Sequence, residues 1–459
     1  MAQENRLPAG ENKMATMPEG KLLFNMALPI IIAMLVQALY NVVDSIYVSR
    51  ISESAVTALS LAFPVQNIMI GFATGIGVGV NSLLSKSLGE NNQDAANRAA
   101  GNGIFLLLLS TVLFILFGIF GARPFFEVQS DIAETVNGGS VYVAICCIGS
   151  IGIFVEILGE RLLQASGRTF YTMITQGVGA IVNIVLDPVF IFGVEPLGIA
   201  PMGIAGAAIA TVIGQWIAAI LAVIFNWKFN PDVQFAPSFC KPRAASLRPI
   251  LTVGIPSIIM MGIGSVMNFA MNQILQGFSE TATGVFGIYF KLQSFFFMPL
   301  FGINNATISI IAFNYGARNP KRITATLLRA TGSALCIMIV GLLAFQLLPD
   351  LMLGIFQPSD EFLRIGRSAL RIISICFPFA AIGIALSGCF QALGNGIYST
   401  ITSLCRQMLV LLPAAYLLSL TGEVTNVWLA WPIAEIASLV VTVLLFLRIY
   451  RQKIKPMYE

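Results

Sequence analysis

The sequence predicts an all-α integral membrane protein with twelve transmembrane helices in two pseudo-symmetric six-helix lobes. Of its 459 residues, 57% are hydrophobic and only 10% are charged, and the mean hydropathy is +0.84. A soluble domain of this length would carry about 25% charged residues. Apolar runs of about 20 residues, long enough to cross a bilayer, recur along the whole chain. A transmembrane barrel is disfavoured, because its strands are alternating segments of about ten residues.

Short polar stretches separate the apolar runs and set the bounds of the helices. The first run is too long for a signal-peptide core and no small-residue cleavage site follows it, so we expect a helix of the mature protein. Proline, which kinks helices, lies in several runs, at Pro29, Pro64, Pro188, Pro256, Pro299, Pro378 and Pro413. The predicted helices are 22–48, 55–88, 100–121, 136–165, 169–192, 202–226, 248–277, 282–315, 323–348, 362–392, 397–420 and 427–450.

Basic residues collect in alternate loops, and acidic residues lie in the loops between them. By the positive-inside rule the basic loops and both chain termini are cytoplasmic, which requires an even number of helices. The loop after the ninth helix departs from this pattern, because it places basic residues on the predicted outer side. Their spacing indicates an amphipathic turn at Arg364, Arg367 and Arg371.

An internal repeat aligns the two halves of the chain without a gap, at a single offset of 227 residues between Pro29 and Pro256. The same offset pairs Asn41 with Asn268, Gln66 with Gln293, Gly75 with Gly302 and Gln164 with Gln391. Six helices separate the copies, so both halves have the same orientation, as in parallel-repeat transporters, whose sites lie between the halves. We therefore predict a solvated cytoplasmic tail (1–20), a first lobe (21–226), a cytoplasmic linker (227–247) and a second lobe (248–459).

Two aspartates lie inside apolar runs, where an ionisable group costs about 3 kcal/mol or more and usually has a function. Asp44 is the only charged residue in the run 22–48, and Asp187 lies in the fifth run. The offset of 227 places Met271 and Ala414 at the equivalent positions, so only the first lobe has these carboxylates.

Neutral polar residues accompany both aspartates. Asn183 lies four residues before Asp187 and therefore on the same helix face. Pro188 frees a backbone carbonyl next to that face, and Thr211 on the sixth helix adds a hydroxyl. The first helix has a polar stripe of Gln37, Tyr40, Asn41 and Asp44.

These oxygens suit a coupling ion. A carboxylate in a medium of low dielectric holds its proton more tightly than one in water, and a second carboxylate nearby strengthens this effect. The chain has no histidine, so a side-chain proton relay would run through carboxylates. The same oxygens also suit Na⁺, at Asp44, Asn183, Asp187 and Thr211. The residues leave H⁺ and Na⁺ open, together with the alternative that the aspartates only join helices by hydrogen bonds.

Three stretches resemble the multidrug and toxic compound extrusion (MATE) transporters, over about residues 20–455. They are PIIIAMLVQALYNVVDSIYV from Pro29, QASGR from Gln164 and NIVLDPVFIFG from Asn183. The third is similar to the DinF-like branch and its MepA-like relatives. The resemblance implies the MATE fold, with lobes that open alternately to either side and expel cationic or amphipathic drugs in exchange for H⁺ or Na⁺. It also implies that Asp44, Asn183, Asp187 and Thr211 form the cation and proton network of the first lobe.

Polar residues inside the runs are candidates for a drug cavity, namely Gln37, Tyr40, Asn41, Glu156, Asn268, Asn272 and Gln391. Glu156 either attracts cationic drugs or forms structural hydrogen bonds, and both readings stay open. The second lobe lacks the acids that the NorM-like branch carries in its seventh and tenth helices, and has Asn268, Asn272 and Gln391 in that region. Lys291 and Arg406 are expected to pair with Glu435 or with each other, in a packing role.

The remaining features exclude several functions. The net charge of +4 follows from topology and gives no case for nucleic acid, and the seven cysteines have no metal or disulfide spacing. We see no Walker lysine and no catalytic constellation, so we expect no enzyme and no cofactor besides the coupling ion. The expected protein is a monomeric, multi-pass antiporter of the bacterial or archaeal cytoplasmic membrane, in contact with lipids. A flippase for lipid-linked oligosaccharides, from the same wider superfamily, is the alternative.

Overall fold

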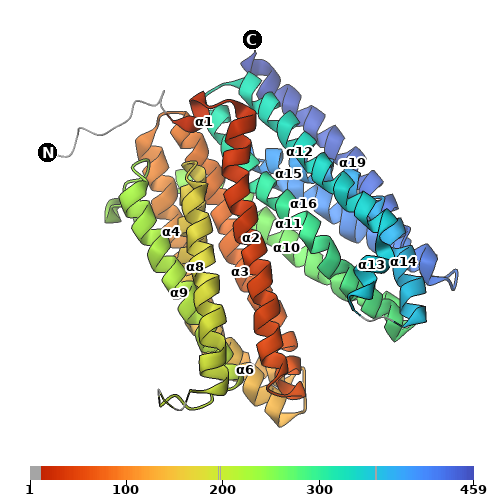
Figure 1. Cartoon of the computed structure of the whole chain (residues 1–459). Helices are drawn as coiled ribbons and strands as arrows, with labels where there is room; N and C mark the ends of the chain where they lie inside the picture. The colour runs from red at the N-terminus through yellow and green to blue at the C-terminus, as the bar shows by residue number, and fades with distance from the viewer. Residues whose placement is uncertain (1–11, 195, 197, 357–358, 459) are drawn as a thin grey trace. The chain divides into compact units, whose positions relative to one another are not determined.

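The secondary structure is helical throughout the part of the chain that a computed structural model describes, residues 12–194, 196, 198–356 and 359–458, apart from an isolated β-bridge. Within that part, ten helices are long and apolar enough to cross a membrane (Figure 1). Two further spans are pairs of helices that meet at a bend, which gives twelve. The predicted class and the number of spans are confirmed.

The helices follow the predicted order, and the fifth has the predicted bounds. Those of the first repeat are α2 (Glu19–Ser49), α3 (Glu53–Gly89), α4 (Gln93–Leu116), α6 (Ala133–Ile148), α7 (Ile151–Ala165), α8 (Thr169–Phe192) and α9 (Ile204–Phe229). Those of the second are α10 (Ala244–Gln276), α11 (Glu280–Gly316), α12 (Pro320–Leu347), α14 (Asp360–Ser374), α15 (Phe377–Ala392), α16 (Gly396–Leu404), the π-helix η5 (Cys405–Leu411), α17 (Leu412–Ser419) and α19 (Ala430–Ile449). Shorter helices are α1 (Lys13–Thr16), η2 (Phe117–Gly121), α5 (Ala122–Glu127), η4 (Pro237–Cys240), α13 (Pro349–Gly354), α18 (Val424–Val427), η6 (Tyr450–Ile454) and η7 (Lys455–Met457).

Two helices predicted as continuous, 136–165 and 362–392, are each broken. α6 and α7 meet at a bend of 47°, and so do α14 and α15. Pro378 lies in the first turn of α15, but the break between α6 and α7 is at Gly149 and Ser150 and contains no proline. The prolines therefore do not account for both bends. At the first bend Gly149 packs closely against α9, because a Cβ atom there would lie 2.5 Å from Cγ1 of Val212.

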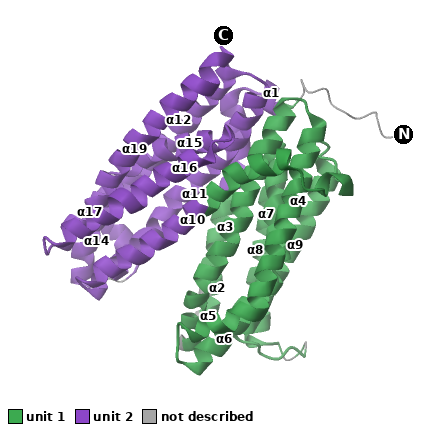
Figure 2. Ribbon diagram, turned by 180° about the vertical axis from the view of Figure 1, so that it is seen from behind, with its two compact units in different colours: residues 1–12, 32–258 green, residues 13–31, 259–459 purple. Residues whose placement is uncertain are grey.

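The chain divides into two compact units (Figure 2). Unit 1 contains residues 32–258, and unit 2 contains residues 13–31 and 259–459. Both boundaries lie inside a helix, α2 or α10, and they are 227 residues apart, like the repeats. We predicted the lobes as 21–226 and 248–459, with their boundaries in loops. In the structure, the first part of α2 belongs to unit 2, with the second repeat, and the first part of α10 belongs to unit 1, with the first repeat.

Two equivalent glycines account for this exchange. A Cβ atom on Gly75 of α3 would lie 2.5 Å from Cγ1 of Ile258 on α10, inside unit 1. A Cβ atom on Gly302 of α11 would lie 2.5 Å from Cγ1 of Ile31 on α2, inside unit 2. Any larger residue would separate the helices, so the glycines that mark the repeat in the sequence are also positions of close helix packing.

The polar linker predicted at 227–247 packs against α4 inside unit 1. Oδ1 of Asn97 accepts a hydrogen bond from the backbone N–H of Gln234 (2.8 Å). Oδ1 of Asn102 accepts one from the backbone N–H of Arg243 (2.9 Å). Both asparagines are buried, so the linker is fixed to the helix by hydrogen bonds shielded from water.

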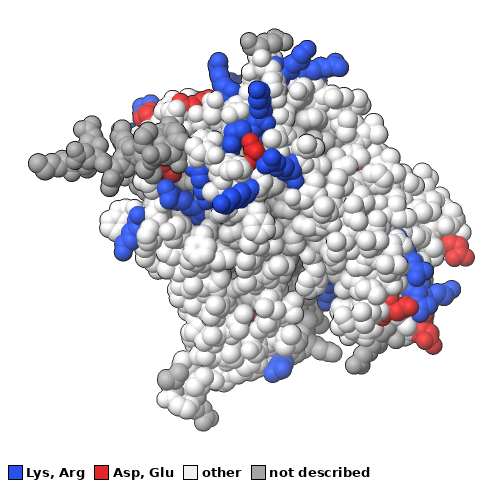
Figure 3. Space-filling view, turned by 45° about the horizontal axis from the view of Figure 1, so that its top comes forward, with Lys and Arg blue, Asp and Glu red and all other residues white. Residues whose placement is uncertain are grey.

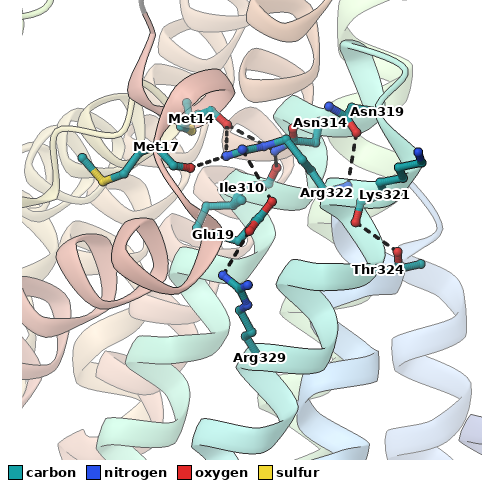
Figure 4. A network of polar contacts seen from close by, with 10 residues as sticks. All are labelled: Met14, Met17, Glu19, Ile310, Asn314, Asn319, Lys321, Arg322, Thr324 and Arg329. Atoms are coloured by element: carbon teal, nitrogen blue, oxygen red, sulfur yellow. Dashed lines mark hydrogen bonds and ion pairs between the residues drawn. The ribbon is translucent and has the colours of Figure 1, made fainter.

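The start of α2 is anchored to α11 and α12 within unit 2 (Figure 4). Oε1 of Glu19 lies 3.5 Å from Nη1 of Arg322, and Oε2 lies 3.0 Å from Nη1 of Arg329. Arg322 also donates through Nη2 to the backbone oxygens of Met14 (3.1 Å) and Met17 (2.6 Å). One guanidinium thus joins α12 to both α1 and the turn that follows it.

This anchor corrects the expected solvated tail at 1–20. Met14 has no exposed surface, and the side chain of Glu19 is 19% exposed. An apolar side chain and a paired carboxylate therefore fix residues 13–19 to unit 2. Residues 1–11 lie outside the described part of the chain.

Replacing Arg322 with glutamine is expected to release α1 from unit 2. The variant loses an ion pair and two charge-assisted hydrogen bonds, and a loss of about 1.4 kcal/mol would open the segment tenfold more often. The measurement is the rate of tryptic cleavage after Lys13, followed by mass spectrometry. Lys321→Gln removes a neighbouring charge that is exposed, and should leave the rate unchanged; equal rates in both variants would contradict the anchor.

The surface fits a lipid environment. Most of the face shown in Figure 3 is uncharged, and exposed apolar side chains such as Leu109, Phe120 and Leu444 lie on the long helices. The predicted amphipathic turn is present as α14, where Arg364, Arg367 and Arg371 are exposed and Ile365, Ala369 and Ile373 are buried.

Candidate functional site

The centre of the candidate site is on α8. Asn183 and Asp187 are 3% and 0% exposed, and both face α9, the helix with which α8 packs most extensively. Nδ2 of Asn183 lies 3.5 Å from Oδ1 of Asp187 and 3.2 Å from Oγ1 of Thr211. Three of the predicted ion-binding residues are therefore in contact inside unit 1.

The orientation of the Asn183 amide follows from its neighbours, because oxygen and nitrogen are assigned from hydrogen bonds. With the two atoms exchanged, the nitrogen donates to Oδ2 of Asp187 (3.2 Å) and the oxygen accepts from the backbone N–H (3.1 Å) and hydroxyl (3.2 Å) of Thr211. This orientation satisfies both ends of the amide. Asn183 then holds the Asp187 carboxylate against α9 without neutralising its charge.

Asp44 brings the second carboxylate from α2. Its charge acts on Asp187, so the two groups are close enough to interact electrostatically within unit 1. Oδ1 of Asp44 is buried and has no hydrogen-bond partner among the described residues. A buried carboxylate oxygen without a donor is costly, and a proton or a metal cation would satisfy it.

Two tyrosines lie near the carboxylates. The Tyr40 hydroxyl interacts electrostatically with Asp44, Glu156 and Asp187, which places this predicted residue among three acids from three helices. Tyr142 was not predicted: it is 2% exposed, interacts with Asp44, and accepts a hydrogen bond from Nε2 of Gln66 (3.0 Å). A tyrosine inside an apolar run gives no signal of its own, although Gln66, as a repeat position, marked the neighbouring helix.

Glu156 belongs to a line of acids on α7. It lies one turn before Glu160, and the two carboxylates interact electrostatically. Glu160 is 4% exposed and accepts a hydrogen bond from Oγ1 of Thr175 (2.8 Å), while Arg161 beside it donates to Oε1 of Gln164 (3.0 Å). The interior of unit 1 therefore holds carboxylates on α7 as well as on α8, with Glu156 and Glu160 one helical turn apart.

The remaining cavity candidates are divided between the units. In unit 1, Gln37 is half-buried and Asn41 is exposed. In unit 2, Asn268 and Asn272 are half-buried on α10, and Nε2 of Gln391 lies 4.0 Å from the sulfur of Met260. A drug cavity that combines these residues stays a prediction.

A known protein family matches both repeats of the chain. The family model MatE matches residues 29–189 and again residues 256–417, so its two matches begin 227 residues apart, at the offset of the internal repeat. The multidrug export protein MepA of Staphylococcus saprophyticus is 23% identical over 434 residues, which cover 93% of this chain and 94% of the relative. MepA of Staphylococcus aureus strain MSSA476 is 24% identical over 442 residues, with the same coverage.

Solved structures agree in fold. A multidrug resistance MATE family transporter of the MOP superfamily, in an outward-facing conformation, superimposes with a TM-score of 0.90 at 25% identity, covering 97% of this chain and 98% of the other. A MOP superfamily transporter from Pyrococcus furiosus superimposes with a TM-score of 0.86 at 26% identity and the same coverage. The predicted resemblance is confirmed. The chain therefore belongs to the MatE family, as a membrane transporter rather than an enzyme.

Proposed function

We propose that this protein is a secondary active exporter that expels cationic and amphipathic drugs in exchange for H⁺ or Na⁺. The observation that supports this most is the buried group of Asn183, Asp187 and Thr211, with Asp44 beside it. The MepA relatives are multidrug export proteins, which supports the drug class. Their bacterial source supports a location in the cytoplasmic membrane of a bacterium or archaeon. The alternation of basic and acidic loops supports cytoplasmic termini.

The coupling ion acts on the two carboxylates. A proton or Na⁺ that enters from outside neutralises the charge shared by Asp44 and Asp187, while Asn183 and Thr211 keep the Asp187 side chain oriented. Removing a buried charge changes which packing of the surrounding helices is stable, and that difference drives alternating access. A charge that moves inward across the membrane adds about 2.3 kcal/mol per 100 mV to this bias.

Glu156 is proposed to attract the drug. The electrostatic interaction between Glu156 and Tyr40 links Glu156 to the coupling group. Its interaction with Glu160 adds negative potential around α7 in unit 1. A cationic drug near Glu156 and an ion at Asp44 would both reduce the negative charge of the same group of carboxylates. Each therefore weakens the binding of the other, as an antiporter requires.

The test is export of ethidium from proteoliposomes under an imposed pH gradient or an imposed Na⁺ gradient, each applied separately. Wild-type protein is expected to export under at least one gradient, which then names the coupling ion. Asp44→Asn keeps the shape of the side chain but cannot exchange an ion, so it should lose gradient-driven export.

Asp94→Asn is the matched control. Asp94 forms an exposed ion pair with Arg98 at the start of α4, so this variant makes the same chemical change outside the interior of unit 1. Export by Asp44→Asn equal to that of wild type would reject the coupling site. Absence of export by folded wild-type protein under either gradient would reject drug antiport, and would direct attention to lipid-linked substrates.

A further inference from the structure

Unit 2 contains a partly buried ion pair that the proposed mechanism does not use. Oε1 of Glu435 on α19 lies 3.5 Å from Nη1 of Arg406. The side chain of Glu435 is 10% exposed and that of Arg406 is 29% exposed. Lys291, the other predicted partner, is exposed and forms no ion pair within the described part of the chain. The carboxylate therefore has one counter-charge, supplied by the protein.

Among the described residues, the surroundings of Glu435 offer no second cation. Tyr289 on α11 and Cys376 before α15 interact with it electrostatically, and both are buried and neutral groups. Gly383 of α15 is also close, because a Cβ atom there would lie 3.7 Å from Oε1 of Glu435. Arg406 lies in the π-helix η5, an irregularity that is frequent at functional sites and that packs against α19.

The repeat relates this pair to the coupling group of unit 1. At the offset of 227, Asn183 and Thr211 correspond to Val410 and Ser438. Arg406 lies one helical turn before Val410, and Glu435 lies about one turn before Ser438, on an antiparallel helix. Oγ of Ser438 donates to the backbone oxygen of Thr402 (3.3 Å), one turn before Arg406. The ion pair therefore lies in the helix interface that corresponds to α8–α9 of unit 1, about one turn from Val410.

In unit 1 the same positions have no charge. Arg406 corresponds to Gly179 and Glu435 to Ala208, which are both buried. Gly179 packs against the backbone of Gly214, with a virtual Cβ 3.2 Å from its carbonyl oxygen. No ion pair reaches Asp44 or Asp187 within the described residues, whereas the carboxylate in the corresponding helix interface of unit 2 has a cation supplied by the protein.

We propose that the Arg406 guanidinium is a permanent counter-cation, which lies in the second-repeat counterpart of the α8–α9 interface and prevents Glu435 from exchanging H⁺ or Na⁺. Arginine keeps its proton in proteins, so this cation does not leave with a gradient. Ion exchange is thereby confined to unit 1. The inference deepens the proposed function, since it explains why one repeat couples and the other does not.

The consequence is a latent ion site. Arg406→Met removes the charge and keeps much of the side-chain volume, so Glu435 is left buried without a counter-charge. A buried carboxylate in that position takes up a proton, or a metal cation, instead of remaining ionised alone. The variant should therefore gain one protonated carboxyl group per protein at neutral pH, which Na⁺ would remove if it binds there.

Infrared spectroscopy of purified protein in lipid nanodiscs measures this through the C=O stretch of a protonated carboxyl group. The expected result is a new band in Arg406→Met, and no such band in Arg406→Met/Glu435→Gln or in Arg406→Lys, which keeps a cation. Thermal unfolding and size-exclusion profiles select folded variants. Should Arg406→Met not fold, Arg406→Gln replaces it.

Two results would overturn the proposal. The first is a folded Arg406→Met protein without the new band and without a Na⁺-dependent change. The second is a protonated-carboxyl band in wild-type protein that Glu435→Gln removes, because Glu435 would then exchange its proton although Arg406 is present. Neither readout involves drug transport, so a failure of the antiport proposal, seen with Asp44→Asn, remains distinguishable.

Discussion

Asp187→Asn is expected to abolish drug accumulation against a concentration gradient while drug binding persists. The Asp187 side chain is completely buried, and Asn183 holds it in place. Asparagine has nearly the same shape and can keep one hydrogen bond to Asn183, but it has no charge for an ion to neutralise. The conformational change would then proceed without ion exchange, and the gradient could no longer drive the drug.

The size of this effect follows from the driving force. One pH unit is worth about 1.4 kcal/mol per proton, which supports an approximately tenfold drug gradient when one proton exchanges for one drug molecule. A tenfold Na⁺ gradient supplies the same free energy. The variant should therefore equilibrate the drug, with a ratio of about one across the membrane, where the wild type reaches about ten.

The measurement is the steady-state ratio of ethidium across proteoliposomes, with binding followed separately by fluorescence polarisation. Asp94→Asn should behave like the wild type in both assays. A normal accumulation ratio in Asp187→Asn would show that this carboxylate is structural, which is the alternative that the sequence left open. Loss of binding together with accumulation would instead place Asp187 in the drug site.

The sequence predicted the membrane class, the twelve spans and the repeat, because these features follow from local composition and from a fixed offset. It also selected Asn183, Asp187 and Thr211, since polar residues at helical spacing inside an apolar run share a face. Their contact across α8 and α9 is what the structure adds. Sequence reasoning could not place the Tyr142–Gln66 hydrogen bond, because neither residue is unusual in its own helix.

Long-range packing was the part that the sequence could not provide. The breaks at Gly149 and Ser150 and between α14 and α15 depend on neighbouring helices, and proline indicated only one of them. The exchange of the first parts of α2 and α10 depends on two glycine contacts between distant segments. The anchoring of Glu19 likewise depends on Arg322, some 300 residues later in the chain, so the tail looked solvated.

Glycine packing next to the coupling group leads to the second large effect. A Cβ atom on Gly214 of α9 would lie 2.8 Å from the backbone oxygen of Gly179 and 3.3 Å from Cβ of Asn183. Both obstacles belong to α8, and the nearer one is backbone, which cannot rotate away. Gly214→Ala must therefore move the two helices apart, at a position three residues from Thr211.

We expect Gly214→Ala to lose gradient-driven export and to unfold at a lower temperature. Overpacking of this kind costs about 1–3 kcal/mol, more than the roughly 0.5–1 kcal/mol that alanine contributes to a helix over glycine. The separation also lengthens the 3.2 Å contact between Asn183 and Thr211, so the Asp187 carboxylate loses its orientation. Transport is measured as for Asp187→Asn, and stability by thermal unfolding in detergent.

Gly177→Ala provides the matched control on α8, because a Cβ atom there would have no neighbour within 4 Å. The same substitution should then leave export unchanged and raise the unfolding temperature slightly, through helix propensity alone. If both variants export normally, the α8–α9 contact tolerates displacement and the coupling group does not depend on close packing. If both lose export, the loss comes from glycine replacement in α8 or α9 generally. The close contact between Gly179 and Gly214 is then not its cause. Opposite behaviour of the two variants is the result that links helix packing to ion coupling, because only Gly214 faces the backbone that holds Asn183.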